Sequence, residues 1–212
     1  SAGEKLSLVH RNLASFYDLE LSSEIDYETL AKFDEQVLFS ALPHGVGASK
    51  LEEIISQAPE LKVVDLSADF RLCTEELHNK HYPSVPYLKE LRDGFAYGLP
   101  EISKEPLLKA QYVANPGCLA TAAALSVAPL VDKDFKGHIV FDLKTGTSGA
   151  GRKVQEVIHH TFRDNNCEAY KVQQHRHESE VLEKLGDPKG ERVTTQFVPH
   201  LLPTSRGILS TS

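Results

Sequence analysis

The sequence predicts an α/β fold in which a parallel sheet is followed by a second unit that contains more strand. Within about thirty residues, 37–66, a strand, a helix and a second strand follow one another, which is the size of a crossover between parallel strands. After residue 117, the regular alternation gives way to a mixture weighted towards strand. We therefore expect two domains, at residues 1–117 and 118–212.

Proline and glycine mark the ends of the elements in the first domain. An apolar run at residues 37–41 predicts a strand that ends at Leu42-Pro43-His44-Gly45. Apolar residues then recur with helical spacing from Leu51 to Ala58, and Pro59 ends this helix. Residues 61–66 and 111–114 predict two further strands.

The second domain is expected to begin with a helix. Alanine and leucine dominate residues 119–130, and both favour helix. Strands are then expected at residues 138–143, 192–198 and 207–210, with a short helix at residues 178–185 between them.

Composition argues against several classes of protein. Of the 212 residues, 41% are apolar and 25% are charged, and no apolar run approaches the roughly 20 residues that a membrane helix needs. A net charge of −7 gives no electrostatic reason to bind nucleic acid. Three cysteines without C-x-x-C spacing, and a start without a secretory signal, predict a reducing, cytoplasmic setting. Since no methionine occurs, we expect either a piece of a longer chain or a sequence from which modified methionines are missing.

Cys118 is the leading candidate for a nucleophile. Asn115-Pro116-Gly117 forms a tight turn directly before the predicted helix, so the thiol is presented at the helix N-terminus. Free backbone N–H groups there lower a thiol pKa and stabilise an oxyanion. The alternative is that Cys118 is a small buried residue, as free cysteines usually are. Cys73 and Cys167 lack this context and are expected to be structural.

A thiol nucleophile needs a partner that moves protons near neutral pH, and histidine is suited to this role. His175 or His177 could serve if the fold brings one of them to Cys118. A zinc site formed with His159, His160 or His200 is disfavoured, because the usual ligand spacings are absent, and no metal is expected.

Two further segments could bind a ligand. The glycine-rich run from Lys144 to Lys153 does not have the spacing of a phosphate-binding P-loop, so it is either a structural loop or a close backbone approach to an anionic or planar ligand. Ser67 and Arg71 follow a predicted parallel strand, where α/β proteins bind ligands. A helix cap with a surface ion pair would explain the same residues.

Four motifs in one order together resemble the N-acetyl-γ-glutamyl-phosphate reductases, and further segments extend the likeness over nearly the whole chain. The motifs are Ala41-Leu42-Pro43-His44-Gly45, the segment Asp65 to Arg71, Asn115-Pro116-Gly117-Cys118, and Ser148-Gly149-Ala150-Gly151-Arg152-Lys153. The resemblance implies a Rossmann-type NADP-binding domain and an α+β catalytic and oligomerisation domain with a mixed sheet, both incomplete here. The family's G-x-x-G-x-x-G loop has no match before Val37, and family members continue beyond the segment that matches residue 212. The related aminoadipyl-phosphate reductases are similar in outline, although Asn115-Pro116 and residues 149–153 look more like the arginine branch.

The resemblance also implies a mechanism and a set of site residues. A thioester on Cys118 would be reduced by NADPH in the third step of arginine biosynthesis, with His175 preferred as the acid/base and His177 second. By analogy, the cofactor would lie near Leu42, Pro43, His44, Ser67, Ser148 and Gly149, and the acyl phosphate substrate near Arg71, Asn115, Arg152 and Arg206. The resemblance also leads us to expect a homodimer or homotetramer. A cofactor-independent cysteine hydrolase or acyltransferase, and a non-catalytic binding or oligomerisation fragment, are the alternatives.

Overall fold

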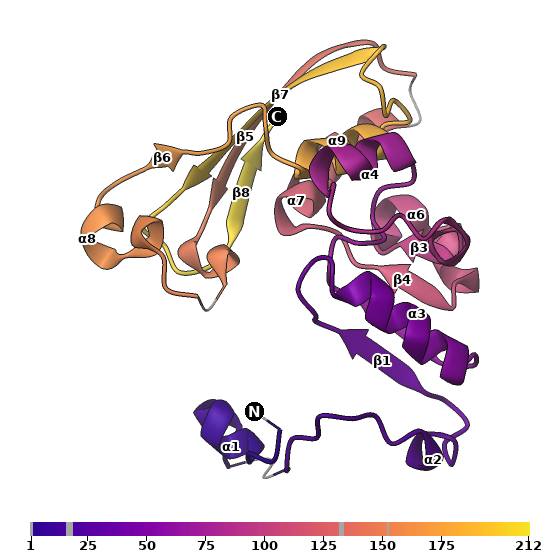
Figure 1. Cartoon of the computed structure of the whole chain (residues 1–212). Helices are drawn as coiled ribbons and strands as arrows, with labels where there is room; N and C mark the ends of the chain where they lie inside the picture. Colours follow the sequence, from indigo (N-terminus) through magenta and orange to yellow (C-terminus); the bar gives the residue numbers. More distant parts are fainter. Residues whose placement is uncertain (1, 16–18, 132–133, 152) are drawn as a thin grey trace.

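The computed structural model contains two four-stranded sheets, one in each half of the chain (Figure 1). It describes residues 2–15, 19–131, 134–151 and 153–212. One sheet is parallel and the other is mixed, so the predicted fold class is confirmed. None of the helices in these described ranges has the length and apolar character that crossing a membrane requires.

The first sheet is parallel throughout. Its strands are β1 (Val37–Ser40), β2 (Lys62–Asp65), β3 (Phe95–Tyr97) and β4 (Tyr112–Ala114), in the order β1-β2-β4-β3. Helix α3 (Gly47–Gln57) connects β1 to β2, which confirms the predicted crossover. All four strands point their carboxyl ends to one edge of the sheet, where ligands of α/β proteins bind.

Helix α3 is held by burial on one side and by a distant carboxylate at its start. Leu51 is fully buried in the core beside the sheet. The carboxylate of Asp69 accepts hydrogen bonds of 3.0 Å from the N–H groups of Gly45 and Ala48. The Ala48 N–H lies in the first turn of the helix, where N–H groups have no partner within the helix, so Asp69 takes the role of a capping residue and also holds the preceding loop at Gly45.

Residues 71–110 contain elements that the sequence did not predict. After the Thr74 cap come the short helices α4 (Glu75–His81) and α5 (Lys89–Arg92), followed by β3. Helix α6 (Pro100–Lys109) has a kink at Ser103 and contains Pro106.

The N-terminal segment runs away from both sheets (Figure 1). It contains α1 (Leu6–Val9), the 3₁₀ helix η1 (Arg11–Leu13) and α2 (Tyr27–Leu30), which Asp26 caps. Large apolar side chains are exposed along it, namely Leu8, Leu19 and Phe33.

The second sheet is mixed, in the order β6-β7-β5-β8. The long strands β5 (Gly137–Thr145) and β7 (Val193–Leu201) pair in parallel, while β8 (Ile208–Thr211) and β6 (Glu168–Ala169) are antiparallel to their neighbours. Short helices lie in the connection from β5 to β6: η2 (Thr147–Ala150), η3 (Glu156–Ile158) and α8 (His160–Arg163).

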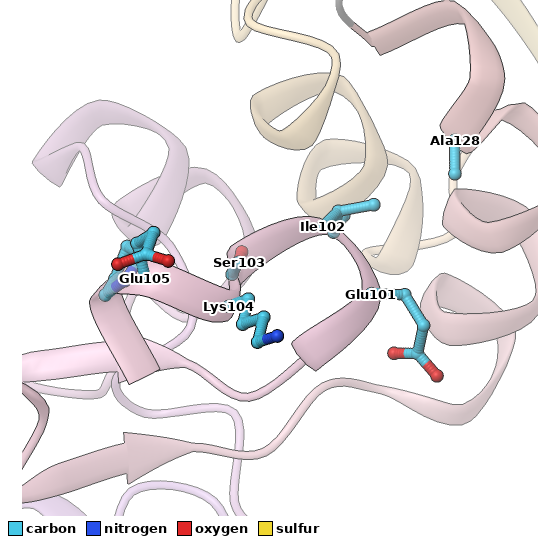
Figure 2. A pocket seen from close by; sticks show the side chains of 7 residues that line it. Glu101, Ile102, Ser103, Lys104, Glu105 and Ala128 are labelled. Carbon is cyan, nitrogen blue, oxygen red and sulfur yellow. The ribbon is translucent and has the colours of Figure 1, made fainter. Parts of the chain in front are cut away.

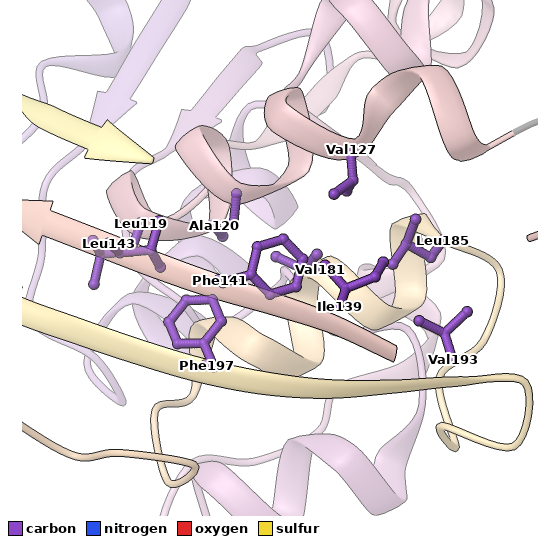
Figure 3. Close-up of a cluster of buried hydrophobic side chains, with 11 residues drawn as sticks. Leu119, Ala120, Val127, Ile139, Phe141, Leu143, Val181, Leu185, Val193 and Phe197 are labelled. Atoms are coloured by element: carbon purple, nitrogen blue, oxygen red, sulfur yellow. The ribbon is translucent and has the colours of Figure 1, made fainter. Parts of the chain in front are cut away.

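Two helices cover one face of the second sheet. Helix α7 (Cys118–Val131) and helix α9 (His177–Lys184) pack on it, around the rings of Phe141 and Phe197, whose centroids are 5.8 Å apart (Figure 3). This core is closed by apolar side chains from both helices and both long strands: Leu119, Ala120, Ala123, Val127, Ile139, Leu143, Val181, Leu185 and Val193. Tyr97 and Leu99 of the first half pack against Ala124 on α7. Helix α7 is therefore anchored on both sides.

Candidate active site

The Cys118 thiol is exposed at the first residue of α7. Strand β4 ends at Ala114, and the N–H of Asn115 still bonds to the carbonyl of Asp65 on β2, 2.8 Å away. The chain then turns, and the Thr121 hydroxyl bonds to the Gly117 carbonyl at 3.0 Å. Cys118 is thus at the carboxyl edge of the parallel sheet and at the start of a helix, as its sequence context predicts.

The ring of His177 lies against the backbone that precedes Cys118. A Cβ atom added to Gly117 would lie 2.2 Å from His177 Nε2, closer than any real contact allows. Residue 117 is therefore required to be glycine by the close approach of the ring. His177 begins α9, which packs against α7.

Both predicted histidines are buried and close together. The centroids of the His175 and His177 rings are 4.6 Å apart, and the N–H of His177 donates to His175 Nδ1 at 3.2 Å. Burial lowers the pKa of each ring to about 3, and neighbouring positive charges act in the same direction. Both rings are therefore neutral at neutral pH, and a pKa of about 3 makes each a weak base unless a nearby negative charge stabilises the protonated ring. His175 also packs on Phe197 and Tyr170, and because burial and, after it, the charge of Cys118 raise the pKa of Tyr170, Cys118 lies near this ring as well.

A buried carboxylate that the sequence analysis did not single out joins these parts. Glu180 is 1% exposed and accepts hydrogen bonds of 3.0 Å from the Gly117 N–H and from the Tyr97 hydroxyl. Its other oxygen lies 3.3 Å from Nη1 of Arg71 and 3.8 Å from Nε2 of His177. The available signal was its spacing of three from His177, which puts both side chains on one face of a helix.

Arg71, a predicted substrate ligand, is buried and bound to the protein itself. Its Nε donates to the Asn115 carbonyl at 2.7 Å, and its Nη2 to the Leu66 carbonyl at 2.9 Å. The Asn115 side-chain amide bonds to the next carbonyl, that of Pro116. Arg206 is exposed in the loop between β7 and β8, and Arg152 lies outside the described residues.

The predicted cofactor residues fall into two groups, which no hydrogen bond joins among the described residues. Leu42, Pro43 and His44 form an exposed loop after β1, and Ser67 is buried after β2. His44 accepts a hydrogen bond of 2.9 Å from the Ala68 N–H, so these two loops are in contact. Ser148 and Gly149 lie on η2, where the Ser148 N–H bonds to the Ser205 carbonyl.

The carboxyl edge of the first sheet fits the ring of a dinucleotide better than its phosphates at α3. Leu42, Val46 and Leu66 are exposed apolar side chains at this edge, where a planar ring could pack. The start of α3, by contrast, is already filled by the Asp69 carboxylate. A phosphate at this helix would have to compete with Asp69 for the Ala48 N–H.

Two cavities of about 320 Å³ each lie apart from Cys118. One is at the kink of α6 beside Ala128 of α7, lined by Glu101, Ile102, Ser103, Lys104, Glu105 and Pro106 (Figure 2). The other adjoins Arg71 and Tyr97. Among the residues that the structure describes, no three histidine, cysteine or acidic side chains are grouped so that they could hold a metal ion.

The sequence matches models of one protein family over both halves of the chain. Residues 1–110 match the family model described as semialdehyde dehydrogenase, NAD binding domain, and residues 118–212 match the model described as semialdehyde dehydrogenase, dimerisation domain. The chain therefore belongs to the semialdehyde dehydrogenase family.

Two curated relatives indicate which reductases within this family the chain resembles. An N-acetyl-γ-glutamyl-phosphate reductase from Desulforudis audaxviator is 41% identical over 99% of this chain, which confirms the resemblance found in the motifs. A Pyrococcus furiosus relative, named as a LysW-linked L-2-aminoadipate/L-glutamate phosphate reductase, is 40% identical over 99% of the chain. The chain spans 60% of the first relative's length and 58% of the second's.

Solved structures support the same fold at low sequence identity. Aspartate semialdehyde dehydrogenase II from Vibrio cholerae is 13% identical with a TM-score of 0.55, covering 85% of this chain and 56% of that one. The Candida albicans enzyme, solved with NADP, is 14% identical with a TM-score of 0.54, covering 82% of this chain and 49% of that one.

Proposed function

We propose that the protein containing this chain reduces N-acetyl-γ-glutamyl phosphate with NADPH to the semialdehyde and phosphate. The observation that carries the proposal is the exposed Cys118 thiol at the start of α7, with the neutral ring of His177 against the turn before it. The 41% identity to a reductase of this name supports the substrate.

Cys118 is the nucleophile in this mechanism. His177 takes the thiol proton, the thiolate attacks the acyl carbonyl, and phosphate leaves, so that the substrate is held on Cys118 as a thioester. When bound, NADPH supplies the hydride that reduces this thioester. Backbone N–H groups at the start of α7 stabilise the oxyanion, although the Gly117 N–H is bound to Glu180 and does not take part. We assign the acid/base role to His177 before His175, reversing the order expected from the sequence.

Glu180 supports the charge changes at His177. When the ring takes a proton, its Nε2 is 3.8 Å from the Glu180 carboxylate, in surroundings from which water is largely excluded. Opposite charges at this distance attract strongly where water is scarce. Arg71 holds Glu180 and the Asn115 carbonyl, so we assign it a positioning role, and Arg206 and Arg152 stay candidates for the substrate.

Family membership supports a proposal for the cofactor and for the assembly. We propose that Leu42, Pro43, His44 and Ser67 face the NADP ring system, with Ser148 and Gly149 approaching it from the second half. The dimerisation model over residues 118–212 supports a homo-oligomer, which we propose to be a homodimer or homotetramer in the cytoplasm. We also propose that the two domains meet between residues 117 and 118.

One assay separates this function from its alternatives. The full-length protein should oxidise N-acetylglutamate semialdehyde with NADP⁺ only when phosphate is present, and Cys118→Ser should abolish turnover. A hydrolase would release product without a change in nicotinamide absorbance, and a non-catalytic fragment would do neither. Because the Pyrococcus relative is almost as similar as the reductase, the carrier-linked aminoadipate semialdehyde should be tested alongside. If the carrier-linked substrate is turned over faster, it takes the place of N-acetyl-γ-glutamyl phosphate in the proposal.

A further inference from the structure

Arg176 reaches across from the second half of the chain to the first. It lies between the two histidines of the site and directly precedes α9. Its Nη2 is 2.9 Å from Nε2 of His44, on the loop that follows β1, and its guanidinium is 5.5 Å from the centroid of the Tyr82 ring. The pair therefore joins the carboxyl edge of the parallel sheet to the start of α9, which carries His177.

The contact between Arg176 and His44 has a donor on both sides. The backbone N–H of Ala68 donates to His44 Nδ1 at 2.9 Å, so Nδ1 is the accepting nitrogen. A neutral imidazole has only one accepting nitrogen, which leaves the hydrogen on Nε2. Burial, assisted by the charge of Arg176, lowers the pKa of His44, so the ring is neutral at neutral pH. Since an arginine can only donate, two N–H groups point at each other.

The N–H groups of the Arg176 guanidinium have no carboxylate partner among the described residues. Among the described residues, Arg176 forms no ion pair, and its one polar contact is the His44 nitrogen. Arg71 differs in this respect, because its guanidinium is already bound to two carbonyls and to Glu180. Of these two arginines beside the site, Arg176 is the one with donors left for a ligand.

We propose that Arg176 and His44 together bind a phosphoryl oxyanion, which accepts one hydrogen bond from the guanidinium and one from His44 Nε2–H. Charged N–H groups bind phosphate oxygens in this way, and one oxygen that accepts from both donors, with the two N–H groups turned towards it, removes their conflict. The identity of the phosphoryl group rests on the proposed function: it is the acyl phosphate, and the phosphate it releases, or a phosphate of NADP. These phosphoryl groups share the same chemistry, and steady-state kinetics distinguish them.

Binding can be measured without turnover. Titration calorimetry of the full-length protein with inorganic phosphate should give about 10- to 100-fold weaker binding in Arg176→Gln, since a charged hydrogen bond is lost. Arg176→Lys keeps the charge and should recover part of the affinity. Arg11→Gln removes an exposed arginine of the N-terminal segment and should bind phosphate as the natural protein does.

The His44 ring provides a second readout that a purely structural role would not change. With ¹⁵N-labelled histidine, the His44 Nε2–H resonance should shift on addition of phosphate in the natural protein and stay unchanged in Arg176→Gln. If Arg176→Gln does not fold, the same two measurements on Arg176→Lys decide the question. Unchanged phosphate affinity in a folded variant, together with an unchanged His44 response, would overturn the proposal.

Kinetics then identify the source of the phosphoryl group. A raised KM for phosphate, with an unchanged KM for NADP⁺, assigns the pair to the substrate, and the reverse assigns it to the cofactor. If no reductase activity is found, weaker phosphate binding in Arg176→Gln still supports the site, so failure of the proposed function is told apart from failure of this inference.

Discussion

Replacing Gly117 by alanine tests the packing of His177 against the turn before Cys118. The added Cβ would lie 2.2 Å from Nε2 and 2.6 Å from Cδ2 and Cε1 of the ring. Non-bonded heavy atoms prefer about 3.5 Å or more, so the ring or the turn must move by roughly 1.3 Å. The Gly117 N–H also donates to Glu180, and that bond is strained by the same movement.

The expected effect is large on activity and moderate on stability. Overpacking of a rigid site costs about 1–3 kcal/mol, and a displacement of about 1 Å in a catalytic group can lower the rate roughly 100-fold. We therefore expect Gly117→Ala to lower kcat for phosphate-dependent semialdehyde oxidation about 100-fold. Urea unfolding should show a loss of about 1–3 kcal/mol.

A double variant isolates the contact between residue 117 and the His177 ring. In a His177→Ala background the ring is gone, so Gly117→Ala should cost at least ~1 kcal/mol less stability than it does in the natural protein. If the cost is equal in both backgrounds, or if Gly117→Ala keeps its full kcat, the ring does not lie where the structure has it and the reasoning fails.

Three further substitutions have measurable outcomes. Glu180→Gln should destabilise the protein by about 3 kcal/mol in urea unfolding, because the buried Arg71 loses its counter-charge; a change under about 0.5 kcal/mol would contradict this. Folding lowers the pKa of His177 from 6.5 to about 3, so its contribution to stability is complete above pH 6.5 and is lost as the pH falls towards 3. The free energy of unfolding should therefore depend less steeply on pH in His177→Gln, by up to about 1.4 kcal/mol per pH unit between pH 6.5 and 4. An unchanged slope would refute the lowered pKa of His177. Phe141→Ala should cost about 3–5 kcal/mol by the same method, more than an exposed Phe39→Ala.

The first crossover could be predicted because its signals are local. An apolar run, a helical repeat around Leu51 and the breaks at Pro43 and Pro59 all lie within the segment that they define. Strand β3 carries no such signal. It is three residues long, lies in a polar segment rich in proline, and is fixed by pairing with β4, from Phe95 opposite Tyr112 to Tyr97 opposite Ala114.

The site shows the same contrast. Cys118 could be singled out because the turn and the helix that present it are its immediate neighbours in sequence. For Glu180 the only local signal was its spacing of three from His177, because its partners Gly117, Tyr97 and Arg71 are 63 to 109 residues away and come together only in the fold. The contact between Arg176 and His44, 132 residues apart, was hidden for the same reason.

Helix α9 is fastened to the first half of the chain, although it belongs to the core of the second. Glu180 binds Arg71 and Tyr97, Ser179 bonds to His81 at 2.7 Å, and the Glu183 carboxylate accepts the Cys73 N–H. A hinge motion between the halves would have to break all four residue pairs together, two of them at a carboxylate shielded from solvent. These contacts resist such a motion, so the Cys118 thiol, which is already exposed, can be reached by a ligand without separating the two halves.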